Sequence, residues 1–210
     1  MPRLIKSLSR LVQRLTFTMA MLAGIIAMGL ATGTPTHHLD PILRQRWGFA
    51  FADFWDGTWY PLLTAIFMTD RPLMFWGILP FTGCSVGVYE WLAGTRRTAW
   101  LYGLTDLGGN LGLALIVVLP LYSLGTATGY ELAHNHDVGM SGGGFGCLGG
   151  SMSRLPDRWR RIALGLAAVY LLVRLLFFTQ LSADLLHLLT FFGGYAYASW
   201  QVPPLAQSRS

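Results

Sequence analysis

Apolar residues gather in six long runs, and short segments rich in glycine, proline or arginine separate them. A helix needs roughly 17–25 mostly apolar residues to cross a bilayer. The runs that reach or approach this length are 15–31, 72–92, 99–119, 138–152, 162–180 and 183–200. The pattern therefore predicts an all-α, polytopic membrane domain over residues 15–200, preceded by a basic segment, 1–14, and followed by a polar tail, 201–210.

Two of the segments depart from a simple span-and-turn pattern. The connection 32–71 is too polar to span a membrane, yet it carries Trp47, Trp55 and Trp59 among several phenylalanines. Tryptophan collects at the membrane–water interface, so this connection is predicted to be an interfacial amphipathic segment. The run 138–152 is short for a span and rich in glycine. Pro120 is expected to end the helix of the run 99–119.

Composition supports a membrane protein over a soluble one. The chain is 53% hydrophobic and 12% charged, whereas soluble domains carry roughly a quarter charged residues. A basic start followed by an apolar run also fits a signal peptide, but no clean small-residue cleavage site follows residue 31. The net charge of +5 comes from short loops and not from a clustered face, so nucleic acid is not an expected partner.

The distribution of basic residues predicts the orientation. With the N-terminus inside, the outer segments hold only Arg44, Arg46 and Arg71. The inner segments hold Arg3, Lys6, Arg10, Arg14, Arg96, Arg97, Arg154, Arg158, Arg160, Arg161 and Arg209. Lysine and arginine are enriched in cytoplasmic loops, so both termini are expected in the cytoplasm. The expected location is a bacterial inner membrane, with membrane lipids as partners.

A serine among glycines opens the fourth run. Ser141 lies between Gly139 and Gly142, with Gly143 and Gly146 following. A hydroxyl at a helix start can be approached closely, and the first N–H groups of a helix are free to face an anion. The alternative is that these glycines only let helices pack closely.

A histidine in the sixth run is the matching candidate. His187 lies near the start of run 183–200, which enters from the same side as the run that carries Ser141. Ionisable residues inside a span are costly and tend to be functional. Equal depth on parallel helices permits a Ser141–His187 hydrogen bond, with Gly142, Gly143, Gly193 and Gly194 allowing close approach. The alternative is a histidine that is bonded to a neighbouring carbonyl.

Together these residues resemble the rhomboid intramembrane serine proteases over about 59–200. The nucleophile motif G-x-S-G-x-x-x-G is matched by Gly139, Ser141, Gly142 and Gly146, and His187 resembles the base of the sixth span, followed by Gly194. Other matches are Glu90 and Gly94, which resemble E-x-x-x-G at the end of the second span, and Trp59 and Thr64, which resemble part of a first-loop motif. The resemblance implies a six-helix rhomboid-like bundle and a substrate that is another protein's transmembrane helix.

The chain departs from the family where the oxyanion donors are expected. Counting back from Glu90, the histidine and asparagine of the family fall on Met74 and Ile78, which donate no hydrogen bond. Asn110, Asn135 and His134 are candidate substitutes. Two functions therefore stay open: a Ser141–His187 protease, and a non-catalytic rhomboid-fold protein that acts as an adaptor or a subunit of a larger membrane complex. A transporter is disfavoured because the halves show no matched broken helices.

The remaining polar residues and the two cysteines do not alter the predicted fold or the candidate site. Arg174, deep in the fifth run, is expected either to pair with a carboxylate, for which Asp184 and Asp106 are the candidates, or to snorkel outward. The histidines at 37, 38, 134 and 136 lack the cysteine or carboxylate cluster that would complete a metal site, so neither a metal nor a cofactor is expected. Cys84 and Cys147 lie in apolar runs and are predicted to be buried free thiols.

Overall fold

The computed structural model describes residues 14–177 and 181–201, and the regular elements of this part of the chain are helices. The helices of the bundle are α2 (Thr16–Thr32), α6 (Pro72–Thr82), α7 (Val88–Ala93), α8 (Thr95–Leu113), α11 (Ser141–Met152), α12 (Asp157–Phe177) and α13 (Leu181–Gln201). The predicted all-α class is confirmed for the described residues. The basic segment 1–14 and the tail 201–210 lie outside them, except for residues 14 and 201.

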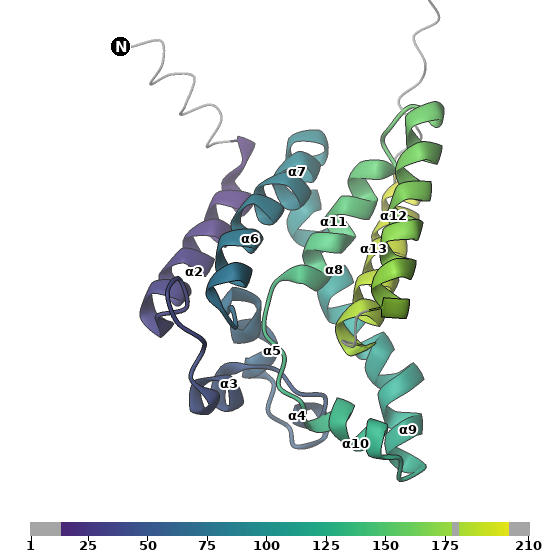
Figure 1. The fold of residues 1–210 in the computed structure, drawn as a ribbon. Helices are drawn as coiled ribbons and strands as arrows, with labels where there is room; N and C mark the ends of the chain where they lie inside the picture. Colours follow the sequence, from purple (N-terminus) through teal and green to yellow (C-terminus); the bar gives the residue numbers. More distant parts are fainter. Residues whose placement is uncertain (1–13, 178–180, 202–210) are drawn as a thin grey trace, which may run out of the picture.

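The helices form a bundle with α11 near its centre (Figure 1). Helix α11 packs most extensively on α13 and then on α8, whereas α12 makes few contacts with the rest. One end of the bundle gathers the start of α2, the α7–α8 turn and the α11–α12 turn. The other end gathers the short helices α3 (Pro41–Trp47), α4 (Ala52–Trp55), α5 (Tyr60–Thr64), α9 (Leu119–Ser123) and α10 (Ala127–His134).

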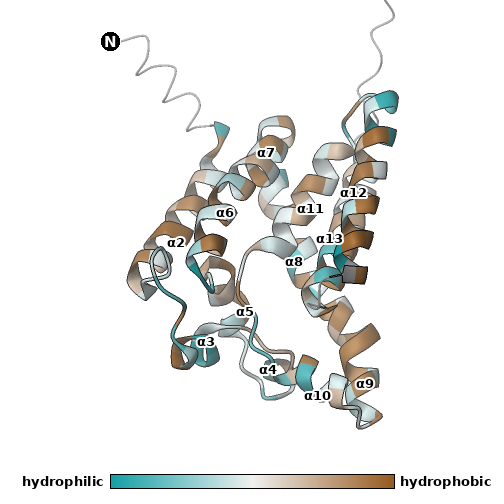
Figure 2. Cartoon of the chain, viewed as in Figure 1, coloured by the Kyte–Doolittle hydropathy of each residue, from teal (hydrophilic) through white to brown (hydrophobic). Residues whose placement is uncertain are grey.

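Two continuous helices in the described part of the chain are long and apolar enough to cross a membrane. They are Pro72–Ala93, formed by α6 and α7, and Thr95–Ser123, formed by α8 and α9. Helix α2 is apolar but shorter, with 17 residues. Figure 2 shows hydrophobic stretches on these helices, whereas α8 is paler and of mixed hydropathy.

Proline does not end the third apolar run, contrary to expectation. The helix continues past Pro120 to Ser123 because a π turn, Ala114–Val118, precedes the proline. A proline lacks the N–H that would bond to the carbonyl four residues earlier, and a wider turn accommodates that gap. A similar π turn, Gly83–Gly87, follows Pro80 between α6 and α7.

The structure differs from the predicted runs at other places as well, and helix α8 begins at Thr95 and not at 99. Helix α12 begins at Asp157 and not at 162, so Arg158, Arg160 and Arg161 are helical and not part of a turn. Helix α11 begins at Ser141, three residues later than the run at 138. Loop 122–136 contains α10, which was not expected.

The connection 32–71 folds into short helices, as its amphipathic composition suggests. Asp40 caps α3 by accepting a hydrogen bond from Ile42 N at 2.7 Å. Thr64 Oγ1 on α5 donates to Trp47 O at 2.8 Å and so ties two of these helices together. The connection is therefore an ordered cover over one end of the bundle, beside the residues that precede α11.

Polar side chains are buried inside the bundle while large apolar side chains face outward. The buried polar residues include Thr105, Asp106, Asn110 and Asp184. Exposed apolar residues include Leu73, Trp76, Leu115, Ile116, Leu166 and Trp200, each more than 60% exposed. Monomeric soluble proteins rarely expose contiguous apolar surface on this scale.

Glu90 joins three elements at one end of the bundle. Its carboxylate, which is 1% exposed, accepts hydrogen bonds from Phe17 N (2.9 Å) and Thr18 N (2.8 Å) at the start of α2. It also accepts hydrogen bonds from the hydroxyls of Thr18 and Thr95, each at 2.6 Å. Gly94 ends α7 with a φ of 84°, a conformation that favours glycine. The two family-matched residues of this turn therefore have a structural role.

Replacement of Glu90 by alanine is expected to destabilise the fold by more than about 3 kcal/mol, because hydrogen bonds to a charged group contribute about 1.5–3 kcal/mol each. The change leaves two N–H groups of α2 without their acceptor. Thermal unfolding of the detergent-solubilised protein measures this loss. Asp56→Ala, which removes an exposed acid, is the control, and equal stability of the two variants would contradict the role of Glu90.

Candidate functional site

The segment before α11 is held in place by backbone hydrogen bonds. Phe49 and Asp137 form an isolated β-bridge, with N···O distances of 2.9 and 2.8 Å. Gly139 N donates to Ala65 O at 2.9 Å. Gly139 has a φ of 126°, and a Cβ there would lie 2.6 Å from Met74 Cε. This extended segment prevents the helix from starting at 138, so Ser141 becomes the first residue of α11.

Ser141 and His187 line the same cavity, whose volume is about 810 Å³. Ser141 opens α11, whereas His187 lies almost two turns inside α13. The cavity is nevertheless shared because contacts between α11 and α13 advance in the same direction along both helices, from Gly142–Leu186 to Gly149–Phe191. The predicted parallel arrangement is therefore present.

Phe145 connects the two candidate residues. It lies one helical turn after Ser141 and therefore on the same face of α11. Its ring stacks on the His187 imidazole with a centroid distance of 4.2 Å and an interplanar angle of 24°. The spacing of four residues between Ser141 and Phe145 indicates from the sequence that both lie on one face of a helix. That Phe145 contacts His187 becomes evident only when α13 is placed beside α11.

Among the hydrogen bonds of the described residues, none joins Ser141 to His187. His187 Nε2 is buried without a hydrogen-bond partner. Catalytic hydrogen bonds are often long or poorly aligned in an empty site and tighten when substrate binds. The structure thus brings the two residues to one cavity and leaves Nε2 available as an acceptor.

Four glycines were predicted to let the helices of Ser141 and His187 approach closely, and this is confirmed for Gly194 but wrong for Gly193. A Cβ on Gly194 would lie 2.0 Å from Gly146 O, so the backbones of α13 and α11 touch there. A Cβ on Gly193 would meet nothing within 4 Å, and Gly193 therefore does not mediate helix packing. Gly143 faces the ring of Tyr102 on α8 and not α13. Gly142 lies against Leu186 and also close to Asp106.

A buried carboxylate on α8 reaches the first turn of α11. Asp106 Oδ1 accepts a hydrogen bond from Gly143 N at 3.0 Å. Because the first N–H groups of a helix have no intrahelical partner, this contact satisfies one of them from a neighbouring helix. Asp106 does not pair with Arg174, which bonds to Asp184 instead. Of the two predicted partners of Arg174, Asp184 is the correct one.

The resemblance to the rhomboid proteases places oxyanion donors at positions 74 and 78, and these two positions have different surroundings. Met74 lines the cavity of Ser141 and His187, and its Sδ accepts a hydrogen bond from Asp70 N at 3.4 Å. Ile78 is 8% exposed and packs in the hydrophobic core. Only position 74 therefore borders the cavity.

Three residues were candidates to replace the missing donors. Asn110 Nδ2 donates to Asp106 O at 2.8 Å, and Asn110 shares with Ser141 a second, small cavity of about 30 Å³. His134 and Asn135 line the large cavity. His134 stacks on Tyr130 at 4.2 Å, and its Nδ1 lies 3.0 Å from Tyr130 O. All three border a cavity that Ser141 also lines.

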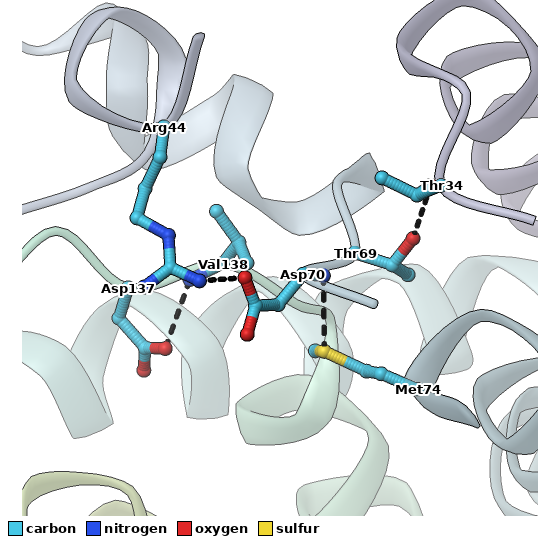
Figure 3. Close-up of polar contacts among 7 residues, drawn as sticks. All are labelled: Thr34, Arg44, Thr69, Asp70, Met74, Asp137 and Val138. Atoms are coloured by element: carbon cyan, nitrogen blue, oxygen red, sulfur yellow. Dashed lines mark hydrogen bonds and ion pairs between the residues drawn. The ribbon is translucent and has the colours of Figure 1, made fainter. Parts of the chain in front are cut away.

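Charged side chains form one rim of the cavity: Arg44, Asp70 and Asp137 line it, and all three are drawn in Figure 3. Arg44 of α3 forms an ion pair with Asp70. Asp137 Oδ1 accepts a hydrogen bond from Val138 N at 2.9 Å, and on the other side of Asp70 the Thr34 and Thr69 hydroxyls lie 2.8 Å apart. This rim combines Arg44 and Asp70 of the connection 32–71 with Asp137 of the segment before Ser141. No motif in the sequence indicated it.

Three of the four loop histidines lie together, next to the cavity of Ser141 and His187. His38, His134 and His136 line a neighbouring cavity of about 620 Å³. Among the residues that the structure describes, no group of three histidine, cysteine or carboxylate side chains is arranged to hold a metal ion.

Both cysteines are free, but Cys84 is exposed and only Cys147 is buried. The prediction that both thiols are buried is therefore wrong for Cys84, which lies on the outer side of the π turn in Pro72–Ala93.

Comparison of the chain with protein-family models, with curated proteins and with solved structures finds no match.

Proposed function

We propose that this chain is a membrane-embedded serine protease in which Ser141 is the nucleophile and His187 is the general base. The observation that carries the proposal is the shared cavity of about 810 Å³, which both side chains line. His187 Nε2 is buried there without a partner, and Phe145 holds the imidazole by stacking from the same face of α11 as Ser141. The fold that accompanies the proposal is a six-span, rhomboid-like bundle.

The membrane setting is supported by the surface and by the placement of charge. Large apolar side chains cover the outside of the long helices, whereas the buried interior contains polar residues. The first turns of α8 and α12, which carry Arg96, Arg97, Arg158, Arg160 and Arg161, lie at the same end of the bundle as the start of α2. Such clustering matches a cytoplasmic face, with both termini inside and the cavity open to the opposite side.

The chemistry would follow from this geometry. Ser141 Oγ attacks the scissile carbonyl carbon while His187 Nε2 takes the hydroxyl proton. His187 then gives that proton to the amine as the carbon–nitrogen bond breaks, which leaves an ester on Ser141. A water molecule repeats the sequence and releases the acid. The N–H of Ser141, at the first position of α11, would donate to the oxyanion.

A non-catalytic function is the second candidate, and Met74 favours it. Its side chain borders the cavity at a position where the resemblance implies a hydrogen-bond donor. The open Ser141–His187 pair also fits a protein that binds membrane helices without cutting them. In this case the chain would be an adaptor or a subunit of a larger membrane complex.

Labelling by a mechanism-based serine reagent tests the protease. Purified protein in detergent, treated with a fluorophosphonate, is expected to gain one adduct on Ser141 by intact-mass and peptide analysis. Ser141→Ala and His187→Asn should abolish labelling, because the first removes the nucleophile and the second its base. Ser182→Ala is the matched control, since Ser182 lines the same cavity.

An unlabelled wild-type protein would contradict the protease, and so would an adduct that persists in Ser141→Ala. Co-purification of an unlabelled protein with a membrane partner, unchanged by Ser141→Ala, would decide for the adaptor.

A further inference from the structure

Asp184 is a buried carboxylate one helical turn before His187. Both residues are on α13, three positions apart, and so lie on neighbouring surface positions of the helix. Asp184 Oδ1 lies 4.0 Å from His187 Nδ1. The side chain of Asp184 is 1% exposed and that of His187 is 12% exposed. An ionised group at this depth requires partners, because removing a carboxylate from water is costly.

Arg174 on α12 provides one partner and fixes the carboxylate. Its Nε donates to Asp184 Oδ1 at 3.0 Å, and its Nη2 lies 2.9 Å from the same oxygen. The second oxygen, Asp184 Oδ2, is buried without a hydrogen-bond partner. The arginine therefore holds the carboxylate in position without using all of its acceptor capacity.

The environment of His187 distinguishes its two ring nitrogens. Nδ1 faces the Asp184 carboxylate, whereas Nε2 is buried without a partner, and the ring packs on Phe145. A proton on Nδ1 is stabilised by the nearby negative charge. The lone pair then remains on Nε2, which is the form a general base needs.

We infer that Asp184, held by Arg174, is a positioning residue that keeps the His187 proton on Nδ1 and presents Nε2 to Ser141. The catalytic consequence depends on the proposed function, since it adds a third member to the Ser141–His187 pair. When Nε2 takes the Ser141 proton, the imidazolium forms beside an ionised Asp184, which stays ionised and stabilises that charge. The distance of 4.0 Å is expected to shorten as the imidazolium forms, because the two groups then carry opposite charges.

The first readout is the tautomer of His187. The full chain, labelled with ¹⁵N-histidine and purified in detergent, contains five histidines, and the His187→Asn spectrum assigns the resonances of His187. In wild-type protein Nδ1 is expected to be protonated and Nε2 not. Asp184→Asn should abolish this preference, because a neutral amide no longer stabilises the Nδ1 proton. Asp157→Asn, at the far end of α12, is the matched control and should leave the tautomer unchanged.

Asp184→Asn also leaves the Arg174 charge with a neutral partner, so a second variant guards against misfolding. The double variant Arg174→Gln/Asp184→Asn removes both charges of the pair and should show the same loss of tautomer preference. Asp184→Glu retains a carboxylate and should restore the preference at least in part. A purely structural clip between α12 and α13 would change thermal stability but not the tautomer.

The second readout is kinetic. Asp184→Asn is expected to lower kcat for cleavage by about 10²–10⁴-fold with little change in KM, as loss of the orienting carboxylate does in serine proteases. A His187 tautomer that is the same in wild type and Asp184→Asn would overturn the inference, and so would a wild-type proton on Nε2. Failure of the serine reagent to label Ser141 would overturn the proposed protease instead, because the tautomer measurement needs no activity.

Discussion

Replacement of Met74 by histidine is expected to raise the rate of cleavage by Ser141 by about 10²–10³-fold, because one oxyanion donor contributes roughly that factor. Met74 borders the cavity of Ser141 and His187 and lies against Gly139, two residues before Ser141. A histidine there places an N–H donor where a thioether now lies. The measurement is the initial rate of cleavage of a transmembrane substrate in detergent or lipid.

Two variants control this prediction. Met74→Leu keeps the apolar volume without a donor and should leave the rate unchanged. Met74→His/Ser141→Ala should be inactive, which would show that the gain passes through Ser141. Equal rates for Met74→His and Met74→Leu would contradict the role of position 74. The companion change Ile78→Asn is not a useful addition, because Ile78 is packed in the core and a buried amide without partners destabilises the fold.

Replacement of Gly194 by alanine is expected to prevent α13 from packing on α11 and to abolish the folded state or lower its melting temperature sharply. The added Cβ would lie 2.0 Å from Gly146 O and 2.7 Å from Gly146 C and Cα. These are backbone atoms of a helix, so they cannot move aside as a flexible side chain does. Overpacking of a core usually destabilises by about 1–3 kcal/mol, and we expect this contact to exceed that range. Size-exclusion chromatography and thermal unfolding in detergent measure it.

The neighbouring glycine is the matched control. Gly193→Ala makes the same chemical change on the same helix, and its Cβ would meet nothing within 4 Å. Because alanine is favoured over glycine in a helix by about 0.8–1 kcal/mol, this variant should be as stable as wild type or slightly more stable. Equal damage by the two substitutions would contradict the close crossing at Gly146 and Gly194.

The helices and the candidate pair could be predicted from the sequence for local physical reasons. Apolar runs located α2 to within a residue at each end, and Pro72–Ala93 at its first residue and to within a residue at its end. Ser141 was recognised from the glycines around it and His187 from its cost inside an apolar run. The boundaries failed where tertiary contacts compete with helix formation. Hydrogen bonds to Phe49 and Ala65 delay α11, and a π turn carries the third helix past Pro120.

The sequence alone determined an all-helical chain with long apolar segments, basic residues on alternate connections, and a candidate serine and histidine on two of the helices. These properties depend on neighbours within a few residues, and hydropathy and spacing report them directly. Only the tertiary structure decided which glycine lies at the helix crossing, that Phe145 stacks on His187, that Met74 but not Ile78 reaches the cavity, and that Asp184 lies between Arg174 and His187. Such contacts depend on how each helix is rotated about its axis, and that rotation is set by packing against neighbours that are distant in the sequence.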